Sequence, residues 1–219
     1  MWVTGERGAG TALSLPYCRF ICPITGRHCT TAIPHHPELN LPTHSGGLTI
    51  VGSFVPITSR QVHELIEHTD ITAVKVDVAA LLSEQHQENE IARAVQLTEQ
   101  GLRRGEDVVV FTSRELITGK GTTNHLSIGK RISASLCSIL QNITTLPRYI
   151  IAKGGITSND LLTKGLGIKR AIILGQIILG VPVWQCAPQG YANNLTYVVF
   201  PVNVGHSQSL TKVVTILKR

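Results

Sequence analysis

The sequence predicts a three-layer α/β fold, in which a mainly parallel or mixed β-sheet carries helices on both faces. From residue 48 onward, short apolar segments alternate with segments of helical periodicity, a pattern typical of βαβ units. Most of the short segments are apolar throughout, as expected for strands that are buried on both faces. Residues 46–219 are therefore predicted to form one domain.

The first half of this domain is predicted to contain strands and helices in alternation. Runs rich in β-branched residues indicate the strands, and apolar residues at helical spacing, such as Val62, Leu65 and Ile66, indicate the helices. The expected elements are strand 48–54, helix 57–68, strand 71–78, helix 88–104 and strand 107–113.

The second half of the domain is predicted from the same two patterns. A long helix is expected over about residues 125–142, a short one over about 158–165, and a closing helix from Gln208. The expected strands are 148–152, 170–177, 181–186 and 196–202.

The first 45 residues show neither the pattern of a strand nor the spacing of a helix. Pro34, Pro37 and Pro42 would interrupt any helix or strand in this segment. Residues 1–45 are therefore predicted to be a disordered or irregular N-terminal arm.

This arm contains three of the five cysteines in the chain. Cys18, Cys22 and Cys29 have the spacing of neither paired zinc ligands nor a small disulfide framework. The sequence therefore predicts no metal site, and the thiols are interpreted as having no role.

The net charge of +6 raises the question of nucleic-acid binding. Lysines and arginines are scattered singly or in pairs, and aromatic residues make up only 5% of the chain, whereas nucleic-acid binding favours basic patches and stacking platforms. Nucleic acid is thus not an expected partner, but attraction for small anions such as phosphates is expected. No segment approaches the ~20 apolar residues that span a bilayer. With no signal peptide evident either, we expect a cytoplasmic protein without membrane contact.

Glycine and hydroxyl residues follow several of the predicted strands. Because ligands of such sheets bind at the carboxyl ends of the strands, these positions are the candidate site. The strand exits are Gly52-Ser53, Thr112-Ser113-Arg114, Gly154-Gly155-Ile156-Thr157 and Asn203-Val204-Gly205.

The pair Gly154-Gly155 stands between a predicted strand and a predicted helix. Two glycines let the backbone turn without a Cβ penalty and let N–H groups approach an anion closely. Thr157 or Ser158 would suit the N-cap of the helix or a phosphate contact, and Asp160 would suit the helix dipole. A purely structural turn with a capped helix would use the same residues, so the corner alone leaves both interpretations open.

Familiar phosphate-binding and catalytic motifs do not match. Gly119-Lys120 is not part of a Walker-type loop, and Gly165-Leu166-Gly167 lacks the third glycine of a dinucleotide fingerprint. A Gly-x-Ser-x-Gly elbow is also absent from the sequence.

Several segments together resemble the C-terminal, nucleotide-binding half of the four-carbon acid sugar kinases. They follow the family's order over about residues 46–215 and read GGLTIVGSFVPITSRQ, VVVFTSREL, SIGKRISASL, RYIIAKGGITSNDLLTKGLGIKRAIILGQIILGVPVW and YVVFPVNVGH. The resemblance implies that the domain binds ATP with Mg²⁺. It also implies phosphorylation of the terminal hydroxyl of a sugar acid of the threonate, erythronate or 3-oxo-tetronate type.

The resemblance also implies site residues. By matching position, the nucleotide contacts are Ser53, Gly154, Gly155, Ile156, Thr157 and Gly205. Arg114 is a candidate for a polyphosphate contact or for a structural ion pair, and the resemblance identifies no catalytic base in this chain.

Some residues depart from the family pattern. Many members carry an acidic residue where Ile156 stands, and Leu179 replaces an expected proline. Val202 stands where one branch of the family has glycine, and a β-branched residue would resist a positive φ there.

The N-terminal substrate domain of the family is not matched by residues 1–45. A sugar acid is therefore expected as substrate only if a substrate domain is supplied. The alternative is a truncated, non-catalytic nucleotide-binding remnant or a fragment of a larger fusion protein. Self-association into a homo-oligomer is a further expectation, because the lack of a partner domain would expose apolar surface.

Overall fold

The computed structural model describes residues 19–21, 28–30, 39, 41–42, 44–113, 122–186 and 194–218. The chain divides into two compact units, residues 1–32 and 33–219. In the first unit, β1 (Arg19–Ile21) and β2 (His28–Thr30) form an antiparallel pair. Cys18, Cys22 and Arg114 lie outside the described residues, and the predicted boundary between residues 45 and 46 stays a prediction.

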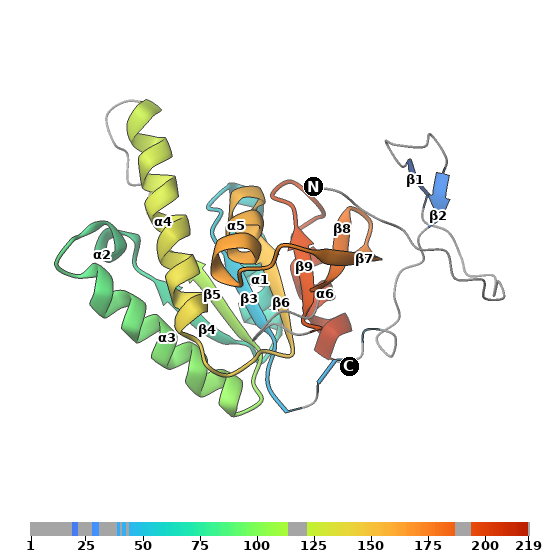
Figure 1. Ribbon diagram of the computed structural model, residues 1–219, viewed down its shortest axis with the longest axis horizontal. Helices are drawn as coiled ribbons and strands as arrows, with labels where there is room; N and C mark the ends of the chain where they lie inside the picture. The colour runs from blue at the N-terminus through green and yellow to red at the C-terminus, as the bar shows by residue number, and fades with distance from the viewer. Residues whose placement is uncertain are drawn as a thin grey trace. The chain divides into compact units, whose positions relative to one another are not determined.

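The larger unit is built on a seven-stranded sheet with the order β4-β5-β3-β6-β9-β8-β7 (Figure 1). Its parallel strands are β3 (Leu48–Val51), β4 (Thr72–Val76), β5 (Val108–Thr112), β6 (Tyr149–Lys153) and β9 (Thr196–Phe200). An antiparallel hairpin of β7 (Ala171–Ile178) and β8 (Val181–Cys186) extends this sheet. The mixed sheet confirms the predicted fold class.

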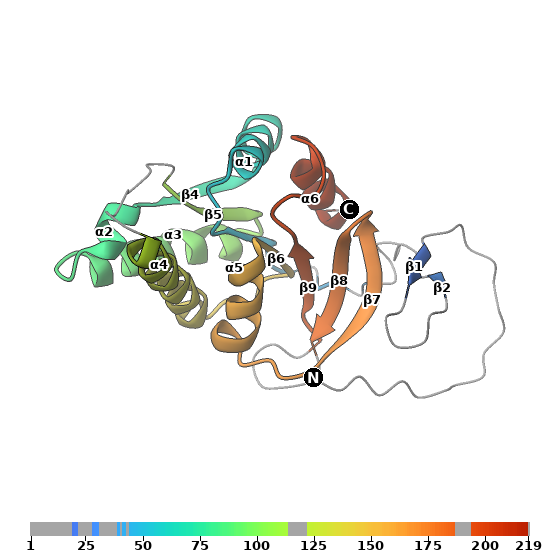
Figure 2. The ribbon, with the colours of Figure 1, turned by 90° about the horizontal axis from the view of Figure 1, so that it is seen from above.

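Helices cover both faces of the sheet (Figure 2). One face carries α1 (Pro56–His68) and α6 (Ser209–Lys218). The opposite face carries α2 (Val78–Leu82), α3 (Gln87–Arg103), α4 (Thr122–Asn142), α5 (Gly155–Asp160) and the π-helical turn Leu161–Gly165 that continues α5. The three layers agree with the prediction from alternating elements.

Successive side chains of the central strands point to opposite faces of the sheet and pack into two separate cores. In β3, Leu48 and Ile50 pack on the side of α3 and α4, whereas Val51 packs on the side of α1 and α6. In β6, Ile150 and Ile151 divide in the same way. All five side chains are fully buried, and each such burial stabilises the fold by about 1.5–3 kcal/mol.

Two short elements differ from the prediction. The helix expected from residue 158 begins at Gly155, and α2 has no counterpart among the predicted elements. With five residues α2 is too short to show helical periodicity, and its start is fixed by Asp77, whose Oδ1 accepts a hydrogen bond from the Ala79 N–H at 2.9 Å. No helix in the described part of the chain is long and apolar enough to cross a membrane.

Glu99 joins α3 to the turn that follows α4. Its carboxylate accepts hydrogen bonds from the backbone N–H and the hydroxyl of both Thr144 and Thr145, and it pairs with Arg103 at 2.9 Å. Burial acts to raise the pKa of Glu99, but these hydrogen bonds outweigh burial and hold the pKa at about 2. Because this pKa is below that of the unfolded chain, the stabilisation is complete above about pH 4.5 and is lost as the pH falls towards about 2.

We expect Glu99→Gln to lower the free energy of unfolding by about 2 kcal/mol at pH 7, because an amide cannot accept all of these hydrogen bonds. Urea denaturation at pH 7 and pH 3 measures the effect, and the difference from wild type should shrink at pH 3. Glu88→Gln is the control, since Glu88 is exposed on the same helix and should change stability by less than about 0.5 kcal/mol. A Glu99→Gln difference that is the same at both pH values would contradict the assignment.

Candidate functional site

The carboxyl ends of the parallel strands lie at one edge of the sheet. The register pairs Val51 of β3 with Lys153 of β6, and Lys153 with Phe200 of β9. The exits Gly52-Ser53, Gly154-Gly155 and residues 201–206 therefore begin side by side (Figure 1). The structure thus brings the predicted site residues to the same edge.

The exits of β3 and β6 turn to opposite faces of the sheet. After β3 the chain enters α1 on one face, and after β6 it enters α5 on the other (Figure 2). Neighbouring parallel strands that diverge in this way leave a crevice outside their carboxyl ends, which is where open α/β sheets bind ligands. The candidate site is therefore the space between these two exits.

The side chain of Thr157 packs between the two exits. A Cβ built on Gly52 would lie 2.3 Å from Thr157 Oγ1, and one built on Gly154 would lie 3.2 Å from the same atom and 3.6 Å from the Cβ of Ser53. Thr157 is buried and Ser53 is half-buried. Glycine at position 52 is thus what lets the two backbones approach.

Gly154 makes the turn from β6 into α5. Its φ of 125° lies in a region that L-residues with a side chain rarely adopt. The Ser158 N–H donates to the Gly154 carbonyl at 2.9 Å, so the helix begins directly after this residue. The corner is therefore a glycine-dependent turn.

The predicted cap by Thr157 or Ser158 is wrong. The N-cap is Gly154, and no side chain caps the helix. Ser158 lies inside the first turn, where its hydroxyl donates to the carbonyls of Ala152 and Gly154 at 2.8 and 2.5 Å. Thr157 instead packs against Gly52. Neither residue is at the N-cap because the helix starts three residues earlier than predicted.

The uncapped first turn is open to the outside. A Cβ built on Gly155 would meet no heavy atom within 4 Å, and Ile156 is 74% exposed. The first N–H groups of a helix have no intrahelical acceptor, so this turn presents donors at the crevice.

Asp160 lies at the end of α5 and not in its first turn, so the predicted fit to the helix dipole is wrong. Its carboxylate accepts a hydrogen bond from Ser133 at 2.7 Å and pairs with Lys164 at 2.9 Å. Burial acts to raise the pKa of Asp160, but these partners lower it overall. The residue ties α5 to α4.

Tyr197 of β9 holds α5 by a hydrogen bond. Its phenol donates a hydrogen bond to the Ser158 carbonyl at 2.7 Å. Burial raises the pKa of Tyr197 well above its usual value, so the hydroxyl stays protonated and keeps this bond over the physiological pH range.

Gln61 of α1 holds the loop that follows β9. Its side-chain amide donates to the carbonyls of Val204 and His206 at 3.1 and 2.9 Å. Gly205 lies between them with φ 78°, and a Cβ there would come within 2.3 Å of Ser209 Oγ. The predicted site residue Gly205 is thus placed on a loop that is held on both sides.

Val202 is compatible with this loop. Among the described residues, Asn194 is the only non-glycine residue with a positive φ. Val202 therefore has no positive φ for its β-branched side chain to resist. Leu179, another departure from the family pattern, lies at the tip of the β7–β8 hairpin and is 77% exposed.

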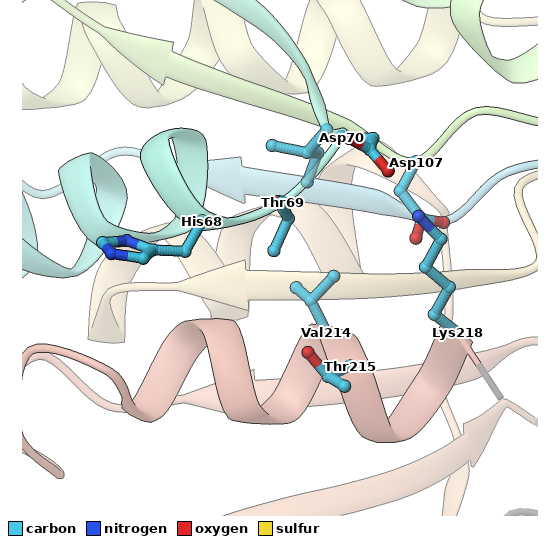
Figure 3. Close-up of a pocket in the computed structure, with 8 residues that line it drawn as sticks. His68, Thr69, Asp70, Asp107, Val214, Thr215 and Lys218 are labelled. Atoms are coloured by element: carbon cyan, nitrogen blue, oxygen red, sulfur yellow. The ribbon is translucent and has the colours of Figure 1, made fainter.

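A separate hollow lies at the opposite edge of the sheet (Figure 3). It has a volume of about 200 Å³, and its lining includes His68 at the end of α1, Asp107 before β5 and Lys218 at the end of α6. This hollow is remote from the strand exits. Within the described ranges, no group of three acidic, histidine or cysteine side chains could hold a metal ion.

A family model described as a nucleotide-binding C-terminal domain matches residues 48–210. The chain belongs to this family. The match spans β3 to the start of α6 and so includes all the strand exits. No curated protein matches the sequence significantly.

Solved structures share the fold of this nucleotide-binding domain. A domain of unknown function from Bordetella bronchiseptica, with bound citrate and in a domain-swapped dimer, has 16% identity and a TM-score of 0.63 over 80% of this chain. A second crystal form of that protein gives 15% identity and a TM-score of 0.58 over 80% of this chain and 40% of its own.

A protein from Salmonella typhimurium LT2, provisionally described as a tRNA synthase, has 18% identity and a TM-score of 0.64 over 80% of this chain. The nucleotide-binding domain spans only 41% of the first Bordetella chain and 42% of the Salmonella chain.

Exposed apolar side chains mark the edge strand β7 of the nucleotide-binding domain. Ile172 and Ile173 are 60% and 59% exposed. Homo-oligomer formation stays a prediction for this chain.

Proposed function

We propose that the domain binds ATP, as its Mg²⁺ complex, in the crevice between the exits of β3 and β6. We further propose that it is the ATP-binding part of a kinase that phosphorylates the terminal hydroxyl of four-carbon sugar acids. The observation that carries the proposal is the divergence of two neighbouring exits within a domain of the nucleotide-binding family. The proposed contacts are Ser53, Gly154, Gly155, Ile156, Thr157 and Gly205.

The residues present fit a nucleotide polyphosphate. The open space above Gly155 leaves room for phosphate oxygens beside the unpaired N–H groups of the first turn, which attract anions. The negative charge of Asp160 is offset by its ion pair with Lys164, and Ser133 donates a hydrogen bond to it. Phe54, which is 56% exposed after β3, and Ile156 offer apolar surface for the base.

Mg²⁺ fits this arrangement without a protein cage. Mg²⁺ usually keeps several water ligands and binds through substrate phosphates with few carboxylates. Phosphoryl transfer depends chiefly on positioning and charge neutralisation. We therefore assign no protein ligand to Mg²⁺ and no catalytic base to this chain.

The sugar acid requires a further part of the enzyme in this proposal. The domain corresponds to about two fifths of the structural neighbours, and we assign no sugar-acid contact to its residues. We propose that a substrate domain presents the sugar acid to the γ-phosphate at the edge where the strands end.

Calorimetric titration with ATP·Mg tests the nucleotide proposal. We expect saturable binding of one nucleotide per chain, and no heat of binding at millimolar ATP·Mg would refute the site.

A coupled ADP-release assay with threonate and erythronate then tests the kinase proposal. We expect turnover with a substrate domain supplied and little without it. ATP binding that never leads to turnover with a supplied domain would instead identify a non-catalytic nucleotide-binding domain.

A further inference from the structure

Lys153 is a fully buried lysine at the last position of β6. It lies between Val51 of β3 and Phe200 of β9 and directly precedes the glycine corner. Lysine is almost never fully buried unless its charge is compensated. Its contacts therefore indicate what the residue does.

The Lys153 ammonium is held by the exit of the neighbouring strand. Nζ donates hydrogen bonds to the carbonyls of Pro201 and Val202 at 2.7 and 3.0 Å, and it lies 4.1 Å from the centroid of the Phe200 ring. Across the described ranges, no carboxylate forms an ion pair with it. The charge is thus compensated only by backbone dipoles and an aromatic face.

These contacts join two of the proposed nucleotide-binding segments. Pro201 and Val202 begin the loop that carries Gly205, and Lys153 leads into the Gly154 corner. Gln61 holds the far end of the same loop at Val204 and His206. Lys153 and Gln61 together therefore fix the loop at both ends.

We propose that Lys153 is a positioning residue of the nucleotide site, which locks the β9 exit loop to the glycine corner and places a buried positive charge beneath the polyphosphate. This inference rests on the proposed ATP binding and adds a residue that contacts the nucleotide only through its neighbours. The expected ligand class is a nucleoside di- or triphosphate. The negative charge of such a ligand is concentrated in its phosphates, which are proposed to lie at the N–H groups of the glycine corner.

The environment of Lys153 makes the charge sensitive to pH. Burial lowers the pKa of Lys153 to about 8, so its positive charge is present below that pH and is lost above it. The register partners of Lys153 in β3 and β9 are the uncharged residues Val51 and Phe200, and the Phe200 ring lies against the ammonium. His206 carries a further titratable side chain on the loop, and His206→Gln removes it from the measurement.

Titration of Lys153→Met and Lys153→Gln with ATP·Mg tests the proposal, with circular dichroism as a check on folding. We expect Lys153→Met to weaken ATP·Mg binding about tenfold or more at pH 7, equivalent to a loss of at least about 1.4 kcal/mol. Gln can donate to both carbonyls without a charge, so Lys153→Gln should recover part of the affinity. Wild-type affinity in a folded Lys153→Met variant would overturn the proposal.

The pH profile of the intact lysine is a second test that needs no change at position 153. In the His206→Gln background, affinity for ATP·Mg should fall about tenfold between pH 7.5 and 9.5, since one charge is lost. A flat profile would overturn the role of the charge. Absence of any ATP·Mg binding by the wild type would refute the nucleotide site itself, whereas binding that is indifferent to Lys153 would refute this inference alone.

Discussion

Gly155→Val is expected to abolish ATP·Mg binding while the domain stays folded. The side chain would enter the open space where the phosphates are proposed to lie, because a Cβ at this position meets no protein atom within 4 Å. Gly155 is not among the residues with a positive φ, so valine can adopt its backbone conformation. We expect the Kd measured by calorimetry to rise at least about 100-fold, a loss of about 2.7 kcal/mol, with unfolding free energy changed by less than about 1 kcal/mol.

The neighbouring glycine is the matched control. Gly154→Ala forces a Cβ onto a residue with φ 125°, which should cost about 1–3 kcal/mol of stability. Gly154→Ala should therefore lower both stability and ATP·Mg binding. Gly155→Val should lower binding alone. If folded Gly155→Val binds ATP·Mg as the wild type does, the corner is a structural turn and the nucleotide site lies elsewhere.

The sheet could be predicted from local sequence because its strands are short and mostly apolar. Residues 181–186 form a strand with the predicted bounds, and α1 begins within one residue of its predicted start. Strand 48–54 is shorter than predicted, since the chain leaves the sheet at Gly52 to make room for Thr157. The end of β3 thus depends on Thr157, which lies about a hundred positions later in the sequence.

The edge that carries the site was also predictable, because parallel strands place their carboxyl ends together. The residues that hold the edge in place were not. Lys153 binds carbonyls 48 and 49 positions away, and Gln61 binds carbonyls 143 and 145 positions away. A lysine at the end of an apolar strand was the one local signal, and it gave no indication of its partners.

The sequence contains a second glycine pair, Gly46-Gly47, whose role differs from that of the corner. A Cβ on Gly46 would lie 1.6 Å from the carbonyl oxygen of Glu106, and one on Gly47 would lie 2.0 Å from the ring of Tyr149. The Gly47 N–H also donates to Asp107 at 2.6 Å. This pair is therefore packed on both positions, whereas Gly155 faces open space.

Gly46→Ala is accordingly expected to destabilise the domain more than any substitution at the corner. The clash is with backbone, so it can be relieved only by separating the segment before β3 from the turn before β5. That movement would strain the hydrogen bonds from the Gly46 N–H to Leu102 and from the Arg148 N–H to Gly46, at 3.3 and 2.9 Å. We expect a loss of more than about 4 kcal/mol in urea denaturation, or no folded protein.

The same substitution in α4 should have the opposite sign, and this comparison tests the packing argument. Gly129 is exposed in the helix, and a Cβ there meets no atom within 4 Å. Gly129→Ala should therefore stabilise the domain by about 0.5–1 kcal/mol through helix propensity. If Gly46→Ala and Gly129→Ala had similar effects, steric packing would not be what requires glycine at position 46. A large loss at Gly46 with a gain at Gly129 would establish that the Gly46-Gly47 pair serves packing, in contrast to Gly155, where a Cβ meets no atom within 4 Å.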